Sequence, residues 1–410
     1  MDTQDNAPDG RVGEADGTAR TALHGLRVAD FSRVLAGPYA TMLLADLGAD
    51  VVKVERPGIG DETRAWHPPA DRNGTSTYFL GVNRNKRSVV LDLATETGLE
   101  QARSLIAASD VLVENFRPGT MERLGLGPRE LRARHPALIY CSISGFGSGA
   151  GATIPGYDLL VQAVGGLMSV TGTADGEPVK AGVALVDVIT GLHASLGILA
   201  ALRHRDATGE GQLVEVNLLG SLLSAMVNQA SAYAVAGVVP GRMGNAHPSI
   251  APYETLPTAD RPIALAVGND RQFTALAEVV GDPGLALDDR FRTNADRVAH
   301  RVALRDTLTK RFRAAGADHW TTVLLAAGVP AGPVNSLEDA FAFAHKLGLP
   351  GIVDIPVSPA DGEDPGAHRQ VAHPIGLSGT PAQYRLPPPR LGQHTAQILH
   401  DPSDPSISRH

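Results

Sequence analysis

Short runs of β-branched and other apolar residues alternate with helix-forming segments in the first part of the chain. The pattern predicts strands at residues 26–31, 51–55, 88–93, 111–114 and 138–144, and helices at 37–48, 96–108 and 129–134. Strands that alternate with helices are typical of a parallel sheet with both faces covered. The first part of the chain is therefore predicted to be an α/β domain with a largely parallel sheet.

The pattern changes in the second half. An Ala- and Leu-rich helical region is predicted from Val188 through Asn217 to Tyr233, and residues 241–253 are loop-like. A strand at 262–268 and helical patterns at 271–280 and 300–327 indicate a second, smaller α/β domain. The predicted divisions are a disordered tail (1–20), a large domain (21–225), a linker (226–245), a small domain (246–335) and a C-terminal segment that returns to the large domain (336–410).

Composition narrows the class of protein. The chain has 410 residues and a net charge of −8, which argues against nucleic acid or an anionic membrane as a partner. The single cysteine, Cys141, permits no internal disulfide and no multi-cysteine metal site, and the histidines form no metal-ligand pattern, so no metal is expected.

Residues 1–20 resemble neither a signal peptide nor a transit peptide, and the apolar run 181–202 is interrupted by Asp187 and other polar residues. We expect a cytoplasmic protein in which this run is a buried helix.

Ligands of parallel sheets bind beyond the carboxyl ends of the strands, where this chain carries many polar residues and arginines. No G-x-G-x-x-G motif opens the first helix, which argues against an NAD-dependent enzyme. Basic residues cluster in this part of the chain, and they are open to two interpretations, phosphate contacts or ordinary solvated charges. They are Arg33, Arg56, Arg64, Arg84, Lys86, Arg87, Arg117 and Arg123.

Asp187 is the most unusual carboxylate because apolar residues flank it on both sides. A buried carboxylate costs free energy unless it is paired, hydrogen-bonded or protonated. Two roles remain open from the residues alone, a helix N-cap and a catalytic group. By contrast, Cys141 and His193 lie among apolar neighbours and are interpreted as core residues.

Long segments of the chain resemble the class III CoA-transferases, a family that includes formyl-CoA and carnitine CoA-transferases and α-methylacyl-CoA racemases. The resemblance runs from about residue 23 to residue 399. The segments that carry it include LHGLRVADFSRVLAGPYATMLLADLGADVVKVERPGIGDETR, NRNKRSVVLDL, DVLVENFRPGTMERLGLG, GYDLLVQAVGGLMSVTG, VDVITGLHASLGILAALRHRDATGEGQLVEVNLL and LGQHT.

The resemblance implies a large domain with a Rossmann-like sheet, a smaller domain and an interlocked homodimer. It also implies that CoA and acyl-CoA are substrates, with no tightly bound cofactor. Asp187, in the segment VDVITG, matches the family's aspartate that forms acyl-aspartyl anhydride and aspartyl-CoA thioester intermediates. This match favours the catalytic role without excluding a capping one.

Further site residues follow from the resemblance by position. The residues that match CoA contacts are Val34, Leu35, Arg56, Asn115, Phe116, Arg123, Leu124 and Phe146. Leu35 stands where formyl-CoA transferases have a glutamine, and Phe146 where they have a tyrosine, which argues against formate or oxalate as substrates. Residues that match the lining of the substrate pocket are Trp66, Tyr157, Gly268, Asn269 and Asp270.

The racemase branch of the family pairs its aspartate with a histidine in a GHD motif. This chain reads GYD at 156–158, and the phenol of Tyr157, with an ordinary pKa near 10, is a poor substitute for imidazole. A transferase is therefore favoured over a racemase, and a catalytically silent CoA-binding protein remains the second alternative. Within the transferases, the chain looks most similar to the branch that uses succinyl-CoA with a dicarboxylate such as glutarate. Arg64, Arg242 and His247 are candidates for binding the distal carboxylate.

Overall fold

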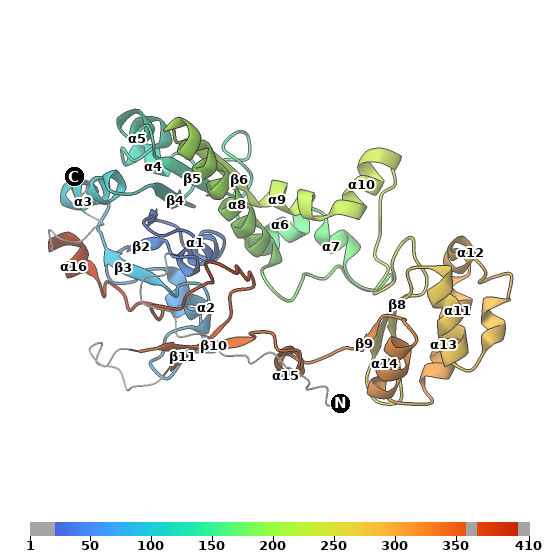
Figure 1. Cartoon of the computed structure of the whole chain (residues 1–410). Coiled ribbons are helices and arrows are strands. Elements are labelled where there is room, and N and C mark those ends of the chain that lie inside the picture. Colours follow the sequence, from blue (N-terminus) through green and yellow to red (C-terminus); the bar gives the residue numbers. More distant parts are fainter. Residues whose placement is uncertain (1–20, 358–366, 401–410) are drawn as a thin grey trace, which may run out of the picture. The chain divides into compact units, whose positions relative to one another are not determined.

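The computed structural model describes residues 21–357 and 367–400, which form two compact units (Figure 1). The predicted tail at 1–20 lies outside the described residues. Of the described residues, the first unit contains 21–156, 187–221, 352–357 and 367–400, and the second contains Tyr157–Val186 and Leu222–Gly351. The chain thus crosses between the units several times.

The first unit is built on a six-stranded parallel sheet with the strand order β3-β2-β1-β4-β5-β6. The strands are β1 (Arg27–Asp30), β2 (Asp50–Glu55), β3 (Lys86–Val90), β4 (Val111–Glu114), β5 (Ile139–Ser144) and β6 (Leu213–Asn217). Residues of β1, β2 and β4 are buried on both sides of the sheet, as expected for a parallel sheet covered by helices. The predicted Rossmann-like α/β fold is confirmed.

Helices connect and cover these strands. They are α1 (Ala36–Asp46), η1 (Glu62–Ala65), α2 (Thr77–Leu80), α3 (Glu96–Ala107), α4 (Thr120–Arg123), α5 (Pro128–Arg134), α8 (Leu185–Thr208), α9 (Leu218–Ala225) and α16 (Thr395–His400). α8 is long and apolar enough to cross a membrane by length and composition alone. One of its faces, with Thr190, Ala194 and Ile198, is nevertheless buried within the protein.

Residues 213–217 form β6, so the helical prediction for this stretch is wrong. β6 pairs in parallel with β5, with Leu213 opposite Tyr140. The physical reason lies in the glycines before it: Gly209 adopts a left-handed conformation after α8, and a Cβ on Gly211 would lie 2.2 Å from the carbonyl oxygen of Leu138. These glycines end the helix and bring the β-branched segment beside β5.

The C-terminal segment belongs to the first unit from Ile352 on, whereas residues 336–351, which the sequence grouped with it, belong to the second. The hairpin of β10 (Ile352–Pro356) and β11 (Ala367–Val371) is followed by α16, whose Ile398 is buried in the core that contains Val89 and Leu91. The backbone N–H groups of Ser88 and Val90 donate to His394 Nδ1 and Thr395 Oγ1, at 3.1 and 3.0 Å. The returning segment therefore satisfies the backbone of the edge strand β3.

The second unit contains a three-stranded antiparallel sheet, β7-β8-β9, with an apolar core. Its elements are α6 (Asp158–Val164), α7 (Leu167–Val170), α10 (Val227–Ala236), β7 (Tyr253–Leu256), β8 (Ile263–Ala266), α11 (Asp270–Val279), η2 (Pro283–Ala286), α12 (Asn294–Ala299), α13 (Arg301–Phe312), α14 (Ala317–Ala326), β9 (Ala331–Pro333) and α15 (Leu337–Lys346).

Residues 157–186 belong to the second unit, whereas the sequence placed them in the large domain. The contacts explain why: the Arg242 side chain donates to the carbonyl oxygens of Thr173 and Gly176, and the N–H of Gly244 donates to Gly172. These hydrogen bonds link residues 157–186 to residues beyond 222. Such long-range contacts leave no pattern in the local sequence from which they could be predicted.

Candidate active site

The strand order places a topological switch point between β1 and β4, because the chain proceeds from these two neighbours in opposite directions across the sheet. Crevices at such points bind ligands in open α/β sheets. The loop 32–35 follows β1, and Asn115 follows β4. Asn115 Oδ1 accepts the Arg33 N–H at 2.9 Å and its Nδ2 donates to the Arg33 carbonyl at 2.7 Å. These two hydrogen bonds link the loop after β1 to the loop after β4 at the switch point.

A cavity of about 360 Å³ opens at this edge of the sheet. Its lining residues are Phe31, Arg33, Lys53, Val54, Glu55, Arg56, Gly60, Asp61, Leu91, Asp92, Leu93, Ala94, Phe116 and Leu124. Three of the residues predicted to contact CoA, namely Arg56, Phe116 and Leu124, line it, whereas Val34, Leu35 and Asn115 lie in or beside the adjoining loop. Arg123 and Phe146 do not line it either: Arg123 donates to Thr120 Oγ1, and Phe146 lies in the turn after β5.

Cationic and aromatic groups meet in this cavity. The Arg33 guanidinium carbon lies 5.1 Å from the centre of the Phe116 ring, and its Nη1 lies 3.3 Å from Glu62 Oε2. The buried Nε of Arg33 has no hydrogen-bond partner among the residues that the structure describes. Arg56 is exposed, and its Nε donates to the Gly60 carbonyl oxygen at 3.2 Å. Two guanidinium groups beside an aromatic ring and leucine side chains suit a ligand with an aromatic part and anionic groups.

Asp187 lies in the first turn of α8, two residues after the helix begins at Leu185. The position differs from that of an N-cap residue, so the capping interpretation does not fit the structure. The N–H of Val186, beside it, instead donates to an Asp158 carboxylate oxygen at 2.8 Å. Negative charge in the first helical turn is stabilised by the helix dipole. Asp187 is half-buried, an environment that keeps a carboxylate accessible yet away from bulk water.

The position of α8 brings Asp187 toward the switch point. Gly191 packs so closely on the first residue of α1 that a Cβ there would lie 2.6 Å from the Ala36 carbonyl oxygen. Residues four apart share a face of a helix, so Asp187 lies on the side of α8 that packs on α1. Because α1 begins directly after the loop 32–35, the carboxylate and this loop belong to one region of the first unit.

The residues predicted to line the substrate pocket are distributed between the units. Trp66, in the first unit, is 42% exposed and packs edge-on against Tyr78. Tyr157, in the second unit, is exposed directly before α6. Asn269 caps α11 by accepting the N–H of Gln272, and the N–H of Gly268 donates to the Gln272 side chain. Asp270 accepts a hydrogen bond from the fully buried Arg297, so these three positions have structural contacts of their own.

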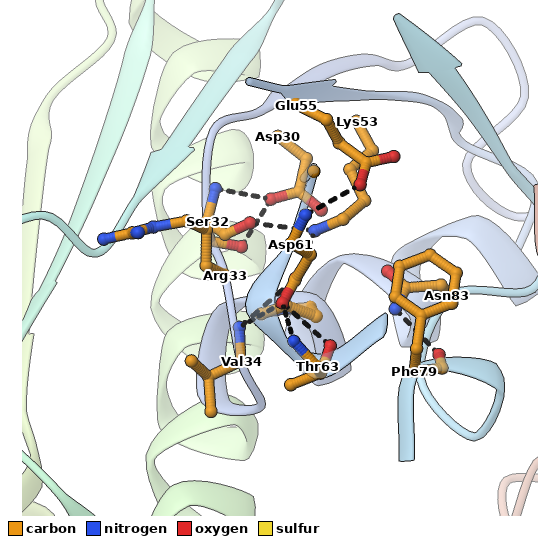
Figure 2. A network of polar contacts seen from close by, with 12 residues as sticks. Asp30, Ser32, Arg33, Val34, Lys53, Glu55, Asp61, Thr63, Phe79 and Asn83 are labelled. Atoms are coloured by element: carbon orange, nitrogen blue, oxygen red, sulfur yellow. Dashed lines mark hydrogen bonds and ion pairs between the residues drawn. The ribbon is translucent and has the colours of Figure 1, made fainter. Parts of the chain in front are cut away.

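Much of the basic cluster is engaged in ion pairs inside the protein, which neither sequence interpretation expected. The pairs are Arg64–Glu55, Arg84–Asp46, Lys86–Asp30 and Arg87–Asp50. A fifth pair, Lys53–Asp61, joins two side chains with no exposed surface at 2.9 Å (Figure 2). Sequence reasoning missed it, although a lysine between valines in a central strand already signals a buried cation that needs a partner.

Cys141 is a core residue, whereas His193, which the sequence also placed in the core, is only partly buried on α8. Cys141 is fully buried, and burial raises the pKa of its thiol above the usual range. His193 Nδ1 lies 3.0 Å from Ser221 Oγ. No group of three or more His, Cys, Asp or Glu side chains that could hold a metal ion occurs within residues 21–357 and 367–400.

Comparisons with known proteins identify the family of this chain. The model of CoA-transferase family III matches residues 23–395. A succinate–glutarate CoA-transferase from Agrobacterium fabrum is 44% identical over 92% of this chain and 94% of its own length. An acetyl-CoA:oxalate CoA-transferase from Acetobacter aceti is 42% identical over 77% of this chain and 81% of its own length.

Solved structures give the same result. The crystal structure of a CAIB/BAIF family protein from Brucella suis superposes with a TM-score of 0.82 at 42% identity, covering 92% of this chain and 98% of that protein. The predicted resemblance is confirmed, and with it the enzyme class: the chain belongs to CoA-transferase family III.

Proposed function

We propose that this enzyme moves CoA from an acyl-CoA, with succinyl-CoA as the leading donor, to a dicarboxylic acid such as glutarate, through a covalent thioester on Asp187. One observation carries the proposal: a cavity with cationic and aromatic walls lies at the switch point of the sheet, and α8 packs its first turns on the same region. The names of similar enzymes, which pair succinate with glutarate or acetyl-CoA with oxalate, support a dicarboxylate as acceptor.

The cavity accounts for binding the nucleotide end of CoA. An adenine ring packs against Phe116 and Leu124, and the phosphates pair with Arg33 and Arg56. The unpaired Arg33 Nε gains an acceptor when an anion binds. The net charge of −8 is compatible with this polyanionic substrate because the positive charge is local.

The chemistry needs only the carboxylate and the CoA thiolate. A carboxylate oxygen of Asp187 attacks the thioester carbonyl and expels CoA thiolate, which leaves a mixed anhydride. The thiolate then attacks the aspartyl carbonyl of the anhydride, which releases the donor acid as its carboxylate and leaves aspartyl-CoA thioester. The acceptor carboxylate attacks this thioester and expels thiolate, and the thiolate takes the acceptor's acyl group. Asp187 is regenerated, with no net proton change.

The proposal extends to assembly and location. Leu192, Leu196 and Leu199 form an exposed apolar stripe on α8, the least exposed of them at 37%. A stripe of this kind suits an obligate partner, and we propose a homodimer, in the cytoplasm.

A screen of donors against acceptors tests the proposed function. Succinyl-CoA, acetyl-CoA and glutaryl-CoA are each incubated with succinate, glutarate, mesaconate and oxalate, and the products are identified by chromatography. The proposal predicts exchange with at least one dicarboxylate. Deuterium that enters the α-carbon of a 2-methylacyl-CoA without transfer would point to a racemase instead, and tight CoA binding without any reaction would point to a silent binding protein.

A further inference from the structure

The loop 32–35 holds an unusual backbone conformation. Val34 has a φ of 69°, in the left-handed region that β-branched residues rarely adopt. Such a conformation is energetically unfavourable and persists only where surrounding contacts determine it. The loop lies between β1 and α1, beside the cavity and on the α1 end that Gly191 of α8 contacts. The conformation of this loop therefore affects both the cavity and the region of α1 on which α8 packs.

Four side chains outside the loop bind its backbone, those of Asp30, Lys53, Asp61 and Asn115. The Ser32 N–H donates to Asp30 Oδ1 at 3.0 Å. Asn115 binds the N–H and the carbonyl of Arg33, and Lys53 Nζ donates to the Ser32 carbonyl at 2.9 Å. The N–H of Val34 points to the Asp61 carboxylate, with its two oxygens at 3.3 and 3.4 Å (Figure 2). The Lys53–Asp61 ion pair thus contacts the loop through both of its members, one at Ser32 and one at Val34.

Asp61 is fixed by further contacts. Its Oδ1 accepts the N–H and the hydroxyl of Thr63 at 3.0 and 2.8 Å, and its own N–H donates to Glu55 Oε2 at 3.0 Å. Although burial alone would raise the pKa of Asp61, Lys53 and the Thr63 hydrogen bonds hold it at about 2. The carboxylate is therefore charged at neutral pH.

The pair belongs to a larger network in which charges balance. Asp30 binds Lys86 and lies near Lys53, and Glu55 binds Arg64. Burial lowers the pKa of Lys86 to about 8, while the charges of Lys86 and Lys53 hold the pKa of Asp30 below its usual value. Three cations thus face three carboxylates. Because buried charges are expensive to separate from their partners, the network resists any rearrangement that would let the loop move.

We propose that Asp61, together with Lys53, is a positioning residue that holds the loop 32–35 in the conformation that binds CoA. Both residues belong to the cavity lining, but their side chains have no exposed surface and act through the loop backbone. Nothing in the chemistry of transfer requires them. The inference rests on the proposed function, since it assigns a role to these residues in binding the nucleotide end of the donor.

The test compares Asp61→Asn with the wild-type enzyme. We expect the KM for acyl-CoA, and the Kd for 3′,5′-ADP measured by calorimetry, to rise about tenfold or more, with kcat within about twofold. A merely structural role would lower the active fraction and so reduce kcat while KM stays constant. A donor truncated to acyl-pantetheine, which lacks the nucleotide, should react equally well with both enzymes.

Two further variants keep the test decisive. Lys53→Gln/Asp61→Asn removes both charges, so the network stays neutral even if Asp61→Asn alone fails to fold, and its KM should also rise. Asp46→Asn is the matched control, because Asp46 is a buried carboxylate paired with Arg84 that contacts neither the loop nor the cavity lining. It should lose stability with KM unchanged.

Distinct results separate the inference from the proposed function. A folded Asp61→Asn enzyme with unchanged KM, or an equal rise of KM in Asp46→Asn, would overturn the positioning role while transfer stands. Failure of the wild-type enzyme to bind 3′,5′-ADP and to transfer CoA would instead overturn the proposed function, and the inference with it.

Discussion

The two units of the chain bury very different side chains. In the first unit, the buried charged residues include Asp30 in β1, Lys53 in β2, Asp61 after β2, and Lys86 at the amino end of β3. The second unit has a core of leucine, valine and phenylalanine side chains, and the charged residues buried in its described part are Glu254 and Arg297.

This difference indicates that the buried residues of the two units have different roles. Apolar packing stabilises a fold without fixing any polar group, and that is what the second unit's core does. Buried ion pairs contribute little or nothing to stability compared with apolar residues of the same size. Their concentration beneath the loop 32–35 is therefore better explained by the need to hold a strained, ligand-binding backbone in place.

The largest expected effect comes from Asp187. Replacement of Asp187 by alanine should lower kcat by at least about 10³-fold, since no nucleophile remains to take the acyl group. Calorimetric binding of 3′,5′-ADP should persist, because the cavity lining does not include this residue. An Asp187→Ala enzyme that still exchanges acyl groups would refute the mechanism.

A substitution in the second unit's core should affect stability alone. Leu308 is fully buried there, and Leu308→Ala should lower the unfolding free energy of this unit by about 2–5 kcal/mol. The two tryptophans allow a clean measurement, because Trp66 lies in the first unit and Trp320 in the second. In a Trp66→Phe background, Trp320 fluorescence in urea should show an earlier transition.

The matched variant is Leu105→Ala, in the core of the first unit, followed through Trp66 in a Trp320→Phe background. Each substitution should shift the transition of its own unit further than that of the other. Equal shifts of both tryptophan signals would mean that the two units unfold in one transition. The two cores would then not stabilise their units independently.

Glu114 predicts a pH dependence of stability. This carboxyl is buried beside Phe116, whose N–H it accepts at 2.8 Å, and burial raises its pKa from 4.5 to about 7. The folded protein therefore binds this proton more tightly than the unfolded chain does. Protonation of Glu114 stabilises the folded protein. This contribution is fully present below about pH 4.5 and is lost as the pH rises toward 7. Glu114→Gln should gain about 1–3 kcal/mol over the wild type at pH 8 and little at pH 4.5.

Urea denaturation at both pH values checks this expectation. A gain of equal size at pH 4.5 and pH 8 would show that titration of Glu114 is not its cause.

The smallest effect is expected at an exposed ion pair. Glu130 and Arg134 lie four residues apart on α5, with 44% and 59% of their side chains exposed. Glu130→Gln should change stability by less than about 0.5 kcal/mol, and less still at high salt. A loss as large as that of Asp46→Asn would undermine the distinction between buried and solvated pairs.

The sequence predicted the sheet of the first unit well, because burial on both faces leaves a clear signal. The strand at 111–114 agrees with β4 at both ends, and the helix from Glu96 ends within one residue of its prediction. β6 was missed because its five residues follow a long helix-forming run, and their strand conformation depends on pairing with β5. Tertiary contacts of this kind are not visible in local pattern.

The candidate site was predicted in part. Arg56, Phe116 and Leu124 follow from the resemblance and line the cavity. The Lys53–Asp61 pair was not found, because pairing is a property of the fold: Lys53 lies within a strand, Asp61 lies eight residues later, and only the turn between them brings the two charges together. Sequence pattern can indicate a buried lysine, but it cannot identify the carboxylate that pairs with it.

The central claim is that Asp187 carries the CoA thioester, and trapping tests it most directly. The enzyme is incubated with succinyl-CoA, treated with hydroxylamine, digested and analysed by mass spectrometry. The account predicts a hydroxamate on the peptide that contains Asp187, dependent on succinyl-CoA and absent from Asp187→Ala. Turnover with Asp187 unmodified, or with the label on another residue, would contradict it.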